Sequence, residues 1–335
     1  MAAAGVRRLV VAPDKFRGSL SALEAATAVG DAARALGWEV DLAPVSDGGE
    51  GFCSVLGGRP RPMTVRGPLG EPVESAWYEL DGGQTAAIEM AMAAGLTLAG
   101  GEEANDPMRA GTAGVGELMA AAVKAGARRL LVGMGGSAST DGGWGALEVL
   151  EPHSRLSGVR IEVACDVRTR FVEAAAVFAP QKGATPAEVE MLTRRLERLA
   201  QLYLQRYRVD VTALDGSGAA GGLAGGLAAI GATLVSGFEL VADRIDLAGR
   251  IETADLVVTG EGLLDEQSFA GKSVGGVVAL AEELGVPVLV MADDVDGDHP
   301  VEYRTLVGVL GEAEAWGDPA GALRRVATDL LAARS

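Results

Sequence analysis

The chain has 335 residues, 48% of them hydrophobic, and its 46 acidic and 29 basic side chains give a formal charge of −17. This apolar fraction is sufficient for a packed core and excludes a disordered or fibrous protein. The acidic balance argues against binding of duplex nucleic acid, whose binders carry clusters of Lys and Arg. The length fits two domains or one large domain.

No apolar run reaches the roughly 18–20 residues that a membrane-spanning helix needs, and the apolar stretch at the N-terminus is too short for a signal peptide. Two cysteines, Cys53 and Cys165, cannot form a disulfide framework, and His153 and His299 lack partners at metal-ligand spacing. We therefore expect a reduced, cytoplasmic protein with neither a membrane nor a nucleic acid as its partner.

Short β-branched runs alternate with Ala-rich helical stretches, which is typical of parallel α/β architecture. Near the start we expect a strand at 7–12, a helix capped by Ser19 or Ser21 that runs through Arg34, and a strand at 39–45. The residues expected on the buried face of this helix follow one another at spacings of three: Leu23, Ala26 and Val29.

The middle of the chain breaks this rhythm. The segment 57–72 holds four prolines and several glycines, which indicates a passage into another unit. A hairpin of 77–80 and 84–90 around Asp81-Gly82-Gly83 should follow it. The elements expected next are a helix at 114–125, strands at 129–133 and 160–165, a polar helix at 186–207 and an Ala/Gly-rich helix at 219–229.

The end of the chain returns to the alternating pattern. Strands are expected at 254–259, 286–291 and 305–310, and helices at 274–284 and 319–333. The economical interpretation is a doubly wound parallel sheet of strand order 2-1-3-4-5, built from 1–56 and 236–335, with a second α/β domain inserted at 57–235. A site would then lie at the carboxyl ends of the strands, facing the inserted domain.

Polar and glycine-rich clusters follow several of these predicted strands. The clusters are 12–19, 46–51, 133–143, Asp166, and 259–262 with Asp265, Gln267 and Lys272 behind it. Glycines let the backbone approach a ligand, amides at a helix N-terminus favour an anion, and carboxylates hold Mg²⁺ or accept a hydroxyl proton. Turns and helix caps need the same residue types, but the number of clusters favours a cleft for an anionic, metal-bound ligand such as a nucleotide.

Several of the residues in these clusters could also have a purely structural role. Lys182 is either a lysine at the start of a helix or a phosphate contact, and Asp166 could cap a turn. Lys15 and Arg17 could be solvated surface cations, and Cys165 is expected to be a small buried residue.

Two familiar nucleotide motifs fail on inspection. Gly271-Lys272-Ser273 resembles the end of a P-loop, but Glu266 stands where that motif requires glycine. The segment 216–221 matches G-x-G-x-x-G without a clean strand before it, so a dinucleotide-binding dehydrogenase is disfavoured.

Taken in order, the clusters resemble the type I glycerate kinase family. The motifs that carry the resemblance are APDKFRGS at 12–19, SDGGEG at 46–51, GPLG at 67–70, IEMA at 88–91, GVGEL at 114–118, GGSASTDGG at 135–143, ACDV at 164–167, PQKGA at 180–184, GAAGG at 218–222 and TGEG at 259–262. The resemblance implies a flavodoxin-like domain with an inserted α/β domain, and ATP- and Mg²⁺-dependent phosphorylation of D-glycerate, typically at the 2-hydroxyl.

The chain also departs from the family pattern. The connection after Gly145 is shorter, and Asp293-Asp294 replaces a glycine that commonly follows the late strand. Two alternatives therefore stay open, namely a relative without catalysis that binds or regulates, and a kinase of another small hydroxy acid or polyol. Under either kinase hypothesis, the partner of the protein is a small-molecule substrate. The sequence leaves open whether the chain forms a homo-oligomer.

On this basis we assign roles to individual residues. Asp47 and Asp141 activate the hydroxyl and hold Mg²⁺, in an order that the sequence does not decide, and Lys15 joins them as a catalytic residue. The residues expected to bind the hydroxy acid are Asp14, Arg17, Ser19 and Asp166. Those expected to bind the nucleotide are Gly135, Gly136, Ser137, Lys182, Gly221, Gly222 and Lys272. The residues expected to complete the metal contacts are Glu261 and Asp265.

Overall fold

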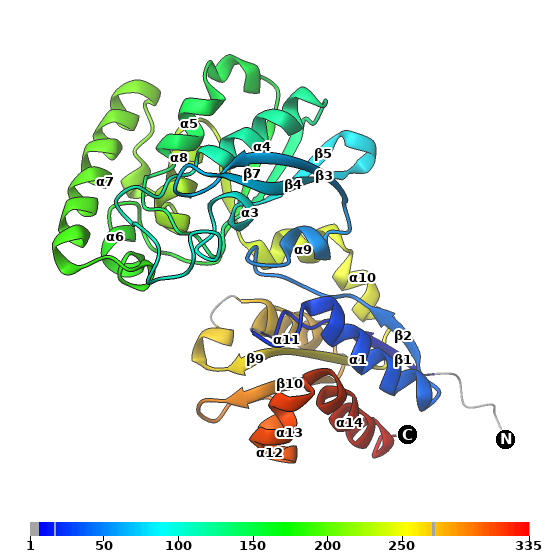
Figure 1. Cartoon of the computed structure of the whole chain (residues 1–335). Helices are drawn as coiled ribbons and strands as arrows, with labels where there is room; N and C mark the ends of the chain where they lie inside the picture. Colours follow the sequence, from blue (N-terminus) through cyan, green and yellow to red (C-terminus); the bar gives the residue numbers. More distant parts are fainter. Residues whose placement is uncertain (1–6, 17, 270–271, 335) are drawn as a thin grey trace. The chain divides into compact units, whose positions relative to one another are not determined.

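The computed structural model describes residues 7–16, 18–269 and 272–334 (Figure 1). The chain forms two compact units: unit 1 comprises Met1–Asp47 and Phe238–Ser335, and unit 2 comprises Gly48–Gly237. The first crossing therefore comes before the proline-rich segment rather than at residue 57. No helix of the described residues is both long and apolar enough to span a membrane.

Unit 1 is built on a five-stranded parallel sheet of order β11-β10-β9-β1-β2. Its strands are β1 (Arg8–Val11), β2 (Glu39–Leu42), β9 (Leu256–Leu264), β10 (Val288–Val295) and β11 (Tyr303–Thr305). Counted along this unit, the order is 2-1-3-4-5, so the predicted doubly wound fold is confirmed.

Helices cover both faces of this sheet. The helices are α1 (Ala22–Ala35), α9 (Gly237–Arg244), α10 (Leu247–Glu252), α11 (Ser273–Glu283) and α14 (Pro319–Ala332). Leu9 and Val11 of β1 pack with α1 and α14, whereas Val10 between them packs with α9, α10 and α11. Because both faces are buried, the strand is continuously apolar, and each such side chain contributes about 1.5–3 kcal/mol by burial.

Helix α1 begins at the second of the two predicted caps. The Ser21 hydroxyl accepts a hydrogen bond from the Glu24 amide, and the Glu24 carboxylate accepts one from the Ser21 amide. Ala26 and Val29 are buried as expected, but Leu23 is 50% exposed, so its place on the buried face was predicted wrongly. A strict spacing of three drifts off a face that repeats every 3.6 residues.

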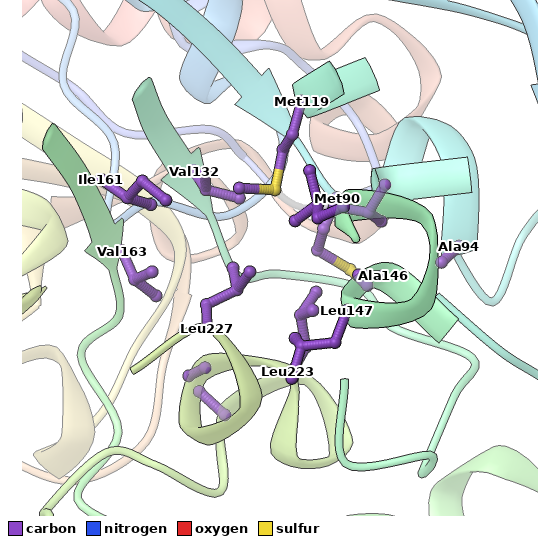
Figure 2. Close-up of a cluster of buried hydrophobic side chains, with 14 of the residues drawn as sticks. Met90, Ala94, Met119, Val132, Ala146, Leu147, Ile161, Val163, Leu223 and Leu227 are labelled. Atoms are coloured by element: carbon purple, nitrogen blue, oxygen red, sulfur yellow. The ribbon is translucent and has the colours of Figure 1, made fainter. Parts of the chain in front are cut away.

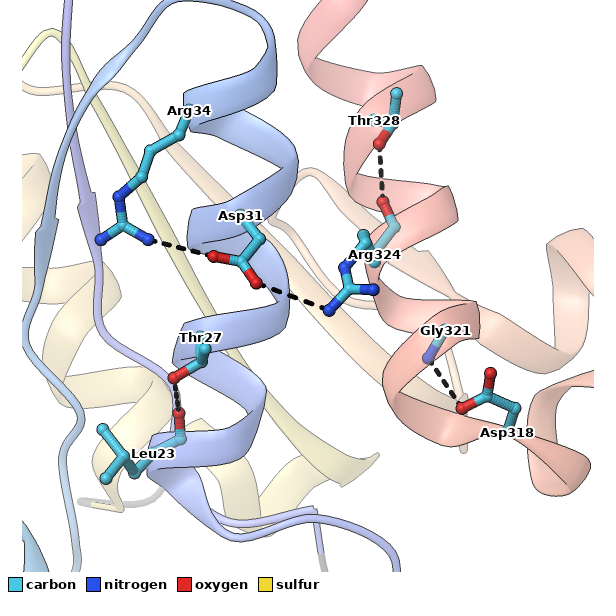
Figure 3. A network of polar contacts seen from close by, with 8 residues as sticks. All are labelled: Leu23, Thr27, Asp31, Arg34, Asp318, Gly321, Arg324 and Thr328. Atoms are coloured by element: carbon cyan, nitrogen blue, oxygen red, sulfur yellow. Dashed lines mark hydrogen bonds and ion pairs between the residues drawn. The ribbon is translucent and has the colours of Figure 1, made fainter.

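Charged residues occupy the outer surface of α1 and α14. Figure 3 shows Asp31 accepting from Arg34 of its own helix at 3.2 Å and from Arg324 of α14 at 3.5 Å. All three side chains are about half exposed, so each pair contributes at most about 1 kcal/mol.

Three predictions for the end of unit 1 need correction. The expected strand at 305–310 is wrong, because α12 (Leu306–Leu310) follows β11 and the Thr305 hydroxyl caps it by accepting from the Gly308 amide at 3.1 Å. Strands β9 and β10 are also longer than predicted. The motif 259–262 and the pair Asp293-Asp294 therefore lie inside strands rather than after them.

Unit 2 contains a mixed six-stranded sheet of order β3-β4-β5-β6-β7-β8. Its strands are β3 (Arg59–Arg66), β4 (Pro72–Leu80), β5 (Thr85–Glu89), β6 (Arg129–Gly133), β7 (Arg160–Ala164) and β8 (Thr233–Val235). The predicted hairpin of β4 and β5 is confirmed. The proline-rich segment is not a linker but the edge strand β3, where Pro60 and Pro62 are tolerated because an edge lacks one hydrogen-bonded neighbour.

The helices of unit 2 are α2 (Phe52–Val55), α3 (Ala91–Ala94), α4 (Ala113–Lys124), α5 (Trp144–Leu150), α6 (Ala174–Phe178), α7 (Pro186–Tyr207) and α8 (Leu223–Ala229). In Figure 2, Met119 of α4, Leu147 of α5 and Leu227 of α8 lie in one apolar cluster with Val132 and Val163 of the sheet. The helix predicted at 219–229 is interrupted: 219–222 is a 3₁₀ turn in which Ala220 and Gly221 have positive φ.

Candidate functional site

In unit 1, a lysine lies between two carboxylates at the carboxyl end of β1. The Lys15 ammonium lies 3.6 Å from Asp14 Oδ1 and 3.5 Å from Asp47 Oδ1. Asp14 is fixed further, since its amide donates to the Gly260 carbonyl of β9 at 2.8 Å and its carboxylate accepts from the Lys15 amide at 2.6 Å. Residues distant in sequence thus form one polar cluster at this edge of the sheet.

The acidic residues of β9 extend this cluster. Glu261 is mostly buried, and its Oε1 atom has no hydrogen-bond partner among the described residues. Asp265 is partly used in local structure, because its Oδ1 atom accepts from the Ser268 amide at 3.0 Å and so caps a 3₁₀ turn. Lys272 donates a hydrogen bond to Gln267 at 3.4 Å, and its positive charge acts to lower the pKa of Glu261.

Burial raises the pKa values of Glu261 and Asp14. Burial is the main cause that raises the pKa of Glu261 to about 7, and the charges of Asp14 and Asp265 act in the same direction. Burial likewise raises the pKa of Asp14, against the opposing effect of Lys15. Carboxyl groups with pKa values raised in this way are typical of functional sites.

The described residues contain no group of three or more His, Cys, Asp and Glu side chains placed to hold a metal ion. This does not conflict with Mg²⁺, which usually keeps several waters and takes one or two carboxylates together with substrate phosphates. The unpartnered oxygen of Glu261 has the chemistry of such a ligand.

In unit 2, the segment 135–141 (hereafter the 135–141 loop) follows β6. The amides of Gly135, Gly136 and Ser137 donate to no acceptor in the described part of the chain. Three successive amides without an acceptor are a typical anion-binding arrangement. A Cβ on Gly135 would lie 2.5 Å from Gly49, so this position requires glycine.

The Lys182 side chain forms hydrogen bonds with the 135–141 loop and is only 3% exposed. Its ammonium donates to Ser137 Oγ at 2.8 Å and to the Ser139 carbonyl at 2.7 Å. Burial lowers the pKa of Lys182 to about 7, although the charge of Asp141 opposes this. The Lys182 side chain is thus bonded within the loop, and its contact with a phosphate stays a prediction.

Asp141 joins the loop to two helices. Its Oδ2 atom accepts from the amide and hydroxyl of Thr112, at 2.9 and 2.8 Å, and from the Gly145 amide at 3.1 Å. Its Oδ1 atom accepts from the Gly143 amide at 3.0 Å. Thr112 precedes α4 and Gly143 precedes α5, so this carboxylate serves both helix N-termini, which complement its negative charge.

Gly221 packs against the 135–141 loop, and Gly222 packs against Gly142, the residue that follows this loop. Gly221 has φ +65°, and its carbonyl accepts from the Gly142 amide at 3.0 Å. A Cβ on Gly221 would lie 2.0 Å from the Ser139 carbonyl oxygen, and one on Gly222 would lie 2.9 Å from Gly142. The structural reason for both glycines is therefore close approach to the loop.

We expect Gly221→Ala to lower the free energy of unfolding by about 2–4 kcal/mol, because it adds a clash to a left-handed backbone. Gly231→Ala is the matched control, since Gly231 has φ +100° and nothing within 4 Å of its Cβ position. The control should lose only about 1–2 kcal/mol. Equal losses in urea unfolding of the two variants would show that close packing at Gly221 is unimportant.

Several residues that hold these segments were not predicted as site residues. Asn105 donates to the carbonyls of Ala138 and Lys182, at 3.2 and 2.8 Å, and Tyr203 donates to the Gly142 carbonyl at 3.0 Å. Glu89 is buried and accepts from the Gly51 amide at 3.2 Å, which holds the segment after Asp47. Only Glu89 left a signal in the sequence, within the motif at 88–91.

The remaining predicted residues are also located. Asp166 accepts from the Gly237 amide at 2.9 Å, and Ser19 bonds to Asp293. Arg17 lies outside the described residues. The predicted residues thus form two groups. The group in unit 1 is Asp14, Lys15, Ser19, Asp47, Glu261, Asp265 and Lys272. The group in unit 2 is Gly135, Gly136, Ser137, Asp141, Asp166, Lys182, Gly221 and Gly222.

Comparison with known proteins gives consistent matches across both units. A sequence model of the glycerate kinase family matches residues 9–153 and 149–330. The chain is 35% identical over 371 residues to the glycerate kinase of Bacillus subtilis (strain 168), a match that covers 97% of each chain. It is 35% identical over 354 residues to the glycerate 2-kinase of Escherichia coli (strain K12), with 91% of this chain and 93% of that one covered.

A solved structure agrees with these matches. The crystal structure of a protein assigned as glycerate kinase 2 from Salmonella typhimurium LT2 has a TM-score of 0.82 and 34% sequence identity to this chain. The match covers 98% of each chain.

Proposed function

Because the chain belongs to the glycerate kinase family, we propose that it transfers the γ-phosphoryl group of ATP to the 2-hydroxyl of D-glycerate. The observation that carries the proposal is the pairing of Lys15 with Asp47 at 3.5 Å. A carboxylate that accepts a hydroxyl proton and a cation for the substrate anion are the two groups that this reaction needs beside the nucleotide.

The hydroxy acid is assigned to unit 1. The Asp47 carboxylate takes the proton of the attacking hydroxyl, and Lys15 holds that carboxylate in place and binds negative charge. Ser19 lies close along the chain and keeps the substrate-binding role expected from the sequence. Arg17 keeps the substrate-binding role expected from the sequence.

The nucleotide is assigned to the 135–141 loop of unit 2. Its amides at Gly135, Gly136 and Ser137 bind phosphate oxygens. Lys182 and Gly221 keep the loop in the shape that presents those amides. Asp141 is assigned to positioning the loop, since both of its oxygens already accept hydrogen bonds.

Glu261, with Asp265 beside it, is proposed to hold Mg²⁺. When bound, Mg²⁺ neutralises negative charge on the phosphoryl group being transferred. Lys272 contributes a further positive charge next to these carboxylates.

A coupled assay of ADP formation with D-glycerate, ATP and Mg²⁺ tests the proposal. Phosphorus NMR then identifies the product, because a 2-phosphate couples to one carbon-bound proton and a 3-phosphate to two. Turnover with a 2-phosphate product supports the proposal. Stabilisation by Mg-ATP without ADP formation would instead indicate a relative that binds without catalysis, and turnover of a different hydroxy acid alone would reassign the substrate.

A further inference from the structure

Asp293 is a buried carboxyl inside a strand of unit 1. It lies in β10, only 1% exposed, next to the buried Ala292, whereas the following Asp294 is exposed. Asp293 and Asp294 stand where the glycerate kinase family commonly has a glycine. The structure distinguishes the two residues, because only Asp293 faces the interior.

The buried carboxylate binds the segment that follows β1. Asp293 Oδ2 accepts a hydrogen bond from Ser19 Oγ at 3.1 Å, and this hydroxyl also lies 3.2 Å from the Phe16 carbonyl. The Ser19 and Leu20 amides donate to the same carbonyl at 2.9 and 3.0 Å, which closes a tight turn. Asp293 thus ties β10 to the end of the segment 14–19, which carries Asp14 and Lys15.

Burial of the Asp293 carboxylate destabilises the folded state. The second oxygen, Oδ1, is buried and has no hydrogen-bond partner among the described residues. Burial disfavours the charged form of Asp293 and raises its pKa to about 6. Met291, two residues earlier on the same face of β10, belongs to a hydrophobic cluster with Phe16, so an apolar side chain at position 293 would be less destabilising. A buried polar atom without a hydrogen-bond partner calls for an explanation, and a functional role is one such explanation.

We propose that Asp293 is a positioning residue that acts through Ser19 and sets the affinity of the segment 14–19 for the hydroxy acid. The inference rests on the proposed function, since it assigns that segment to the substrate. It predicts that Asp293 affects the KM of the hydroxy acid and leaves the KM of ATP unchanged.

The test compares five variants with the wild-type enzyme in the ADP assay. Asp293→Val removes the acceptor and suits a buried strand position, so the protein should stay folded and be at least as stable in urea. Its KM for D-glycerate should rise about tenfold or more, the size expected for losing a hydrogen bond to a charged group. Asp293→Asn keeps an acceptor oxygen for Ser19 and should restore most of the affinity.

The other three variants, which are Ser19→Ala, its combination with Asp293→Val, and Asp294→Asn, supply the double-mutant cycle and the control. If Asp293 acts through Ser19, adding Asp293→Val to Ser19→Ala should produce no further rise in KM. Asp294→Asn removes one charge from the exposed neighbour and should leave both KM values unchanged. Additive effects in the double variant, an equal rise in both KM values, or the same rise in Asp294→Asn would each overturn the inference while wild-type turnover stays intact. Absence of wild-type turnover would instead overturn the proposed function, and this inference with it.

Discussion

Replacing Asp47 by Asn should lower kcat for D-glycerate by about two to four orders of magnitude, the contribution typical of a general base. The amide has nearly the same shape but cannot take the proton of the attacking hydroxyl. The side chain is 29% exposed and its ion pair with Lys15 spans 3.5 Å, so stability should change by less than about 1 kcal/mol. Steady-state kinetics with urea unfolding separates the two effects.

Asp31→Asn is the matched control for this variant. Asp31 is also an aspartate of unit 1 with an arginine at 3.2 Å, but it lies on the outer surface of α1 (Figure 3). The control should keep wild-type kcat. If Asp47→Asn retained more than about a tenth of the wild-type kcat, Asp47 would not be the base.

The fold of unit 1 could be predicted because its signals are local. Continuous apolar runs such as 7–12 mark strands that are buried on both faces, and Ser21 marks a helix start by its own chemistry. The boundary of unit 2 was missed because an edge strand tolerates prolines, and 57–72 therefore has the composition of a linker. The segment 305–310 was misassigned because a short apolar run fits strand and helix equally well.

The candidate site could be predicted only in part. The sequence predicted that Asp14 and the 135–141 loop follow strands, which the structure confirms. The sequence could not show that Lys182 and Asp293 are buried, because burial of a charged side chain depends on elements distant along the chain. Nor could it show that the four hydrogen bonds accepted by Asp141 make it a support for two helices.

The second large effect is expected at Lys182, in the pH dependence of stability. The pKa of its ammonium falls from 10.5 to about 7 in the folded chain, mainly through burial. Between these values the unfolded chain binds a proton that the folded chain lacks, so stability increases with pH. The slope approaches about 1.4 kcal/mol per pH unit, and the total gain from pH 7 to pH 10.5 is about 4–5 kcal/mol.

Lys182→Met should remove this slope, because its side chain carries no proton at any pH. Near pH 7 the variant loses two hydrogen bonds but also the cost of a buried charge, so its stability should lie within about 1–3 kcal/mol of wild type. At higher pH it should become progressively less stable than wild type. Urea unfolding from pH 7 to 9.5 measures the difference, and Lys124→Met, at an exposed position of α4, should run parallel to wild type.

The same variant tests how the 135–141 loop binds phosphate. Without the Lys182 amino group, Ser137 Oγ and the Ser139 carbonyl lose their buried donor, and the loop no longer has a fixed shape. The Kd for Mg-ATP should rise by about tenfold or more, because the amides are then not preorganised for the anion. Calorimetry at pH 8 measures this directly. An unchanged Kd with the altered stability slope would mean that Lys182 supports the fold of unit 2 but not its nucleotide site, whereas parallel stability curves would mean that its ammonium is not buried as the structure shows.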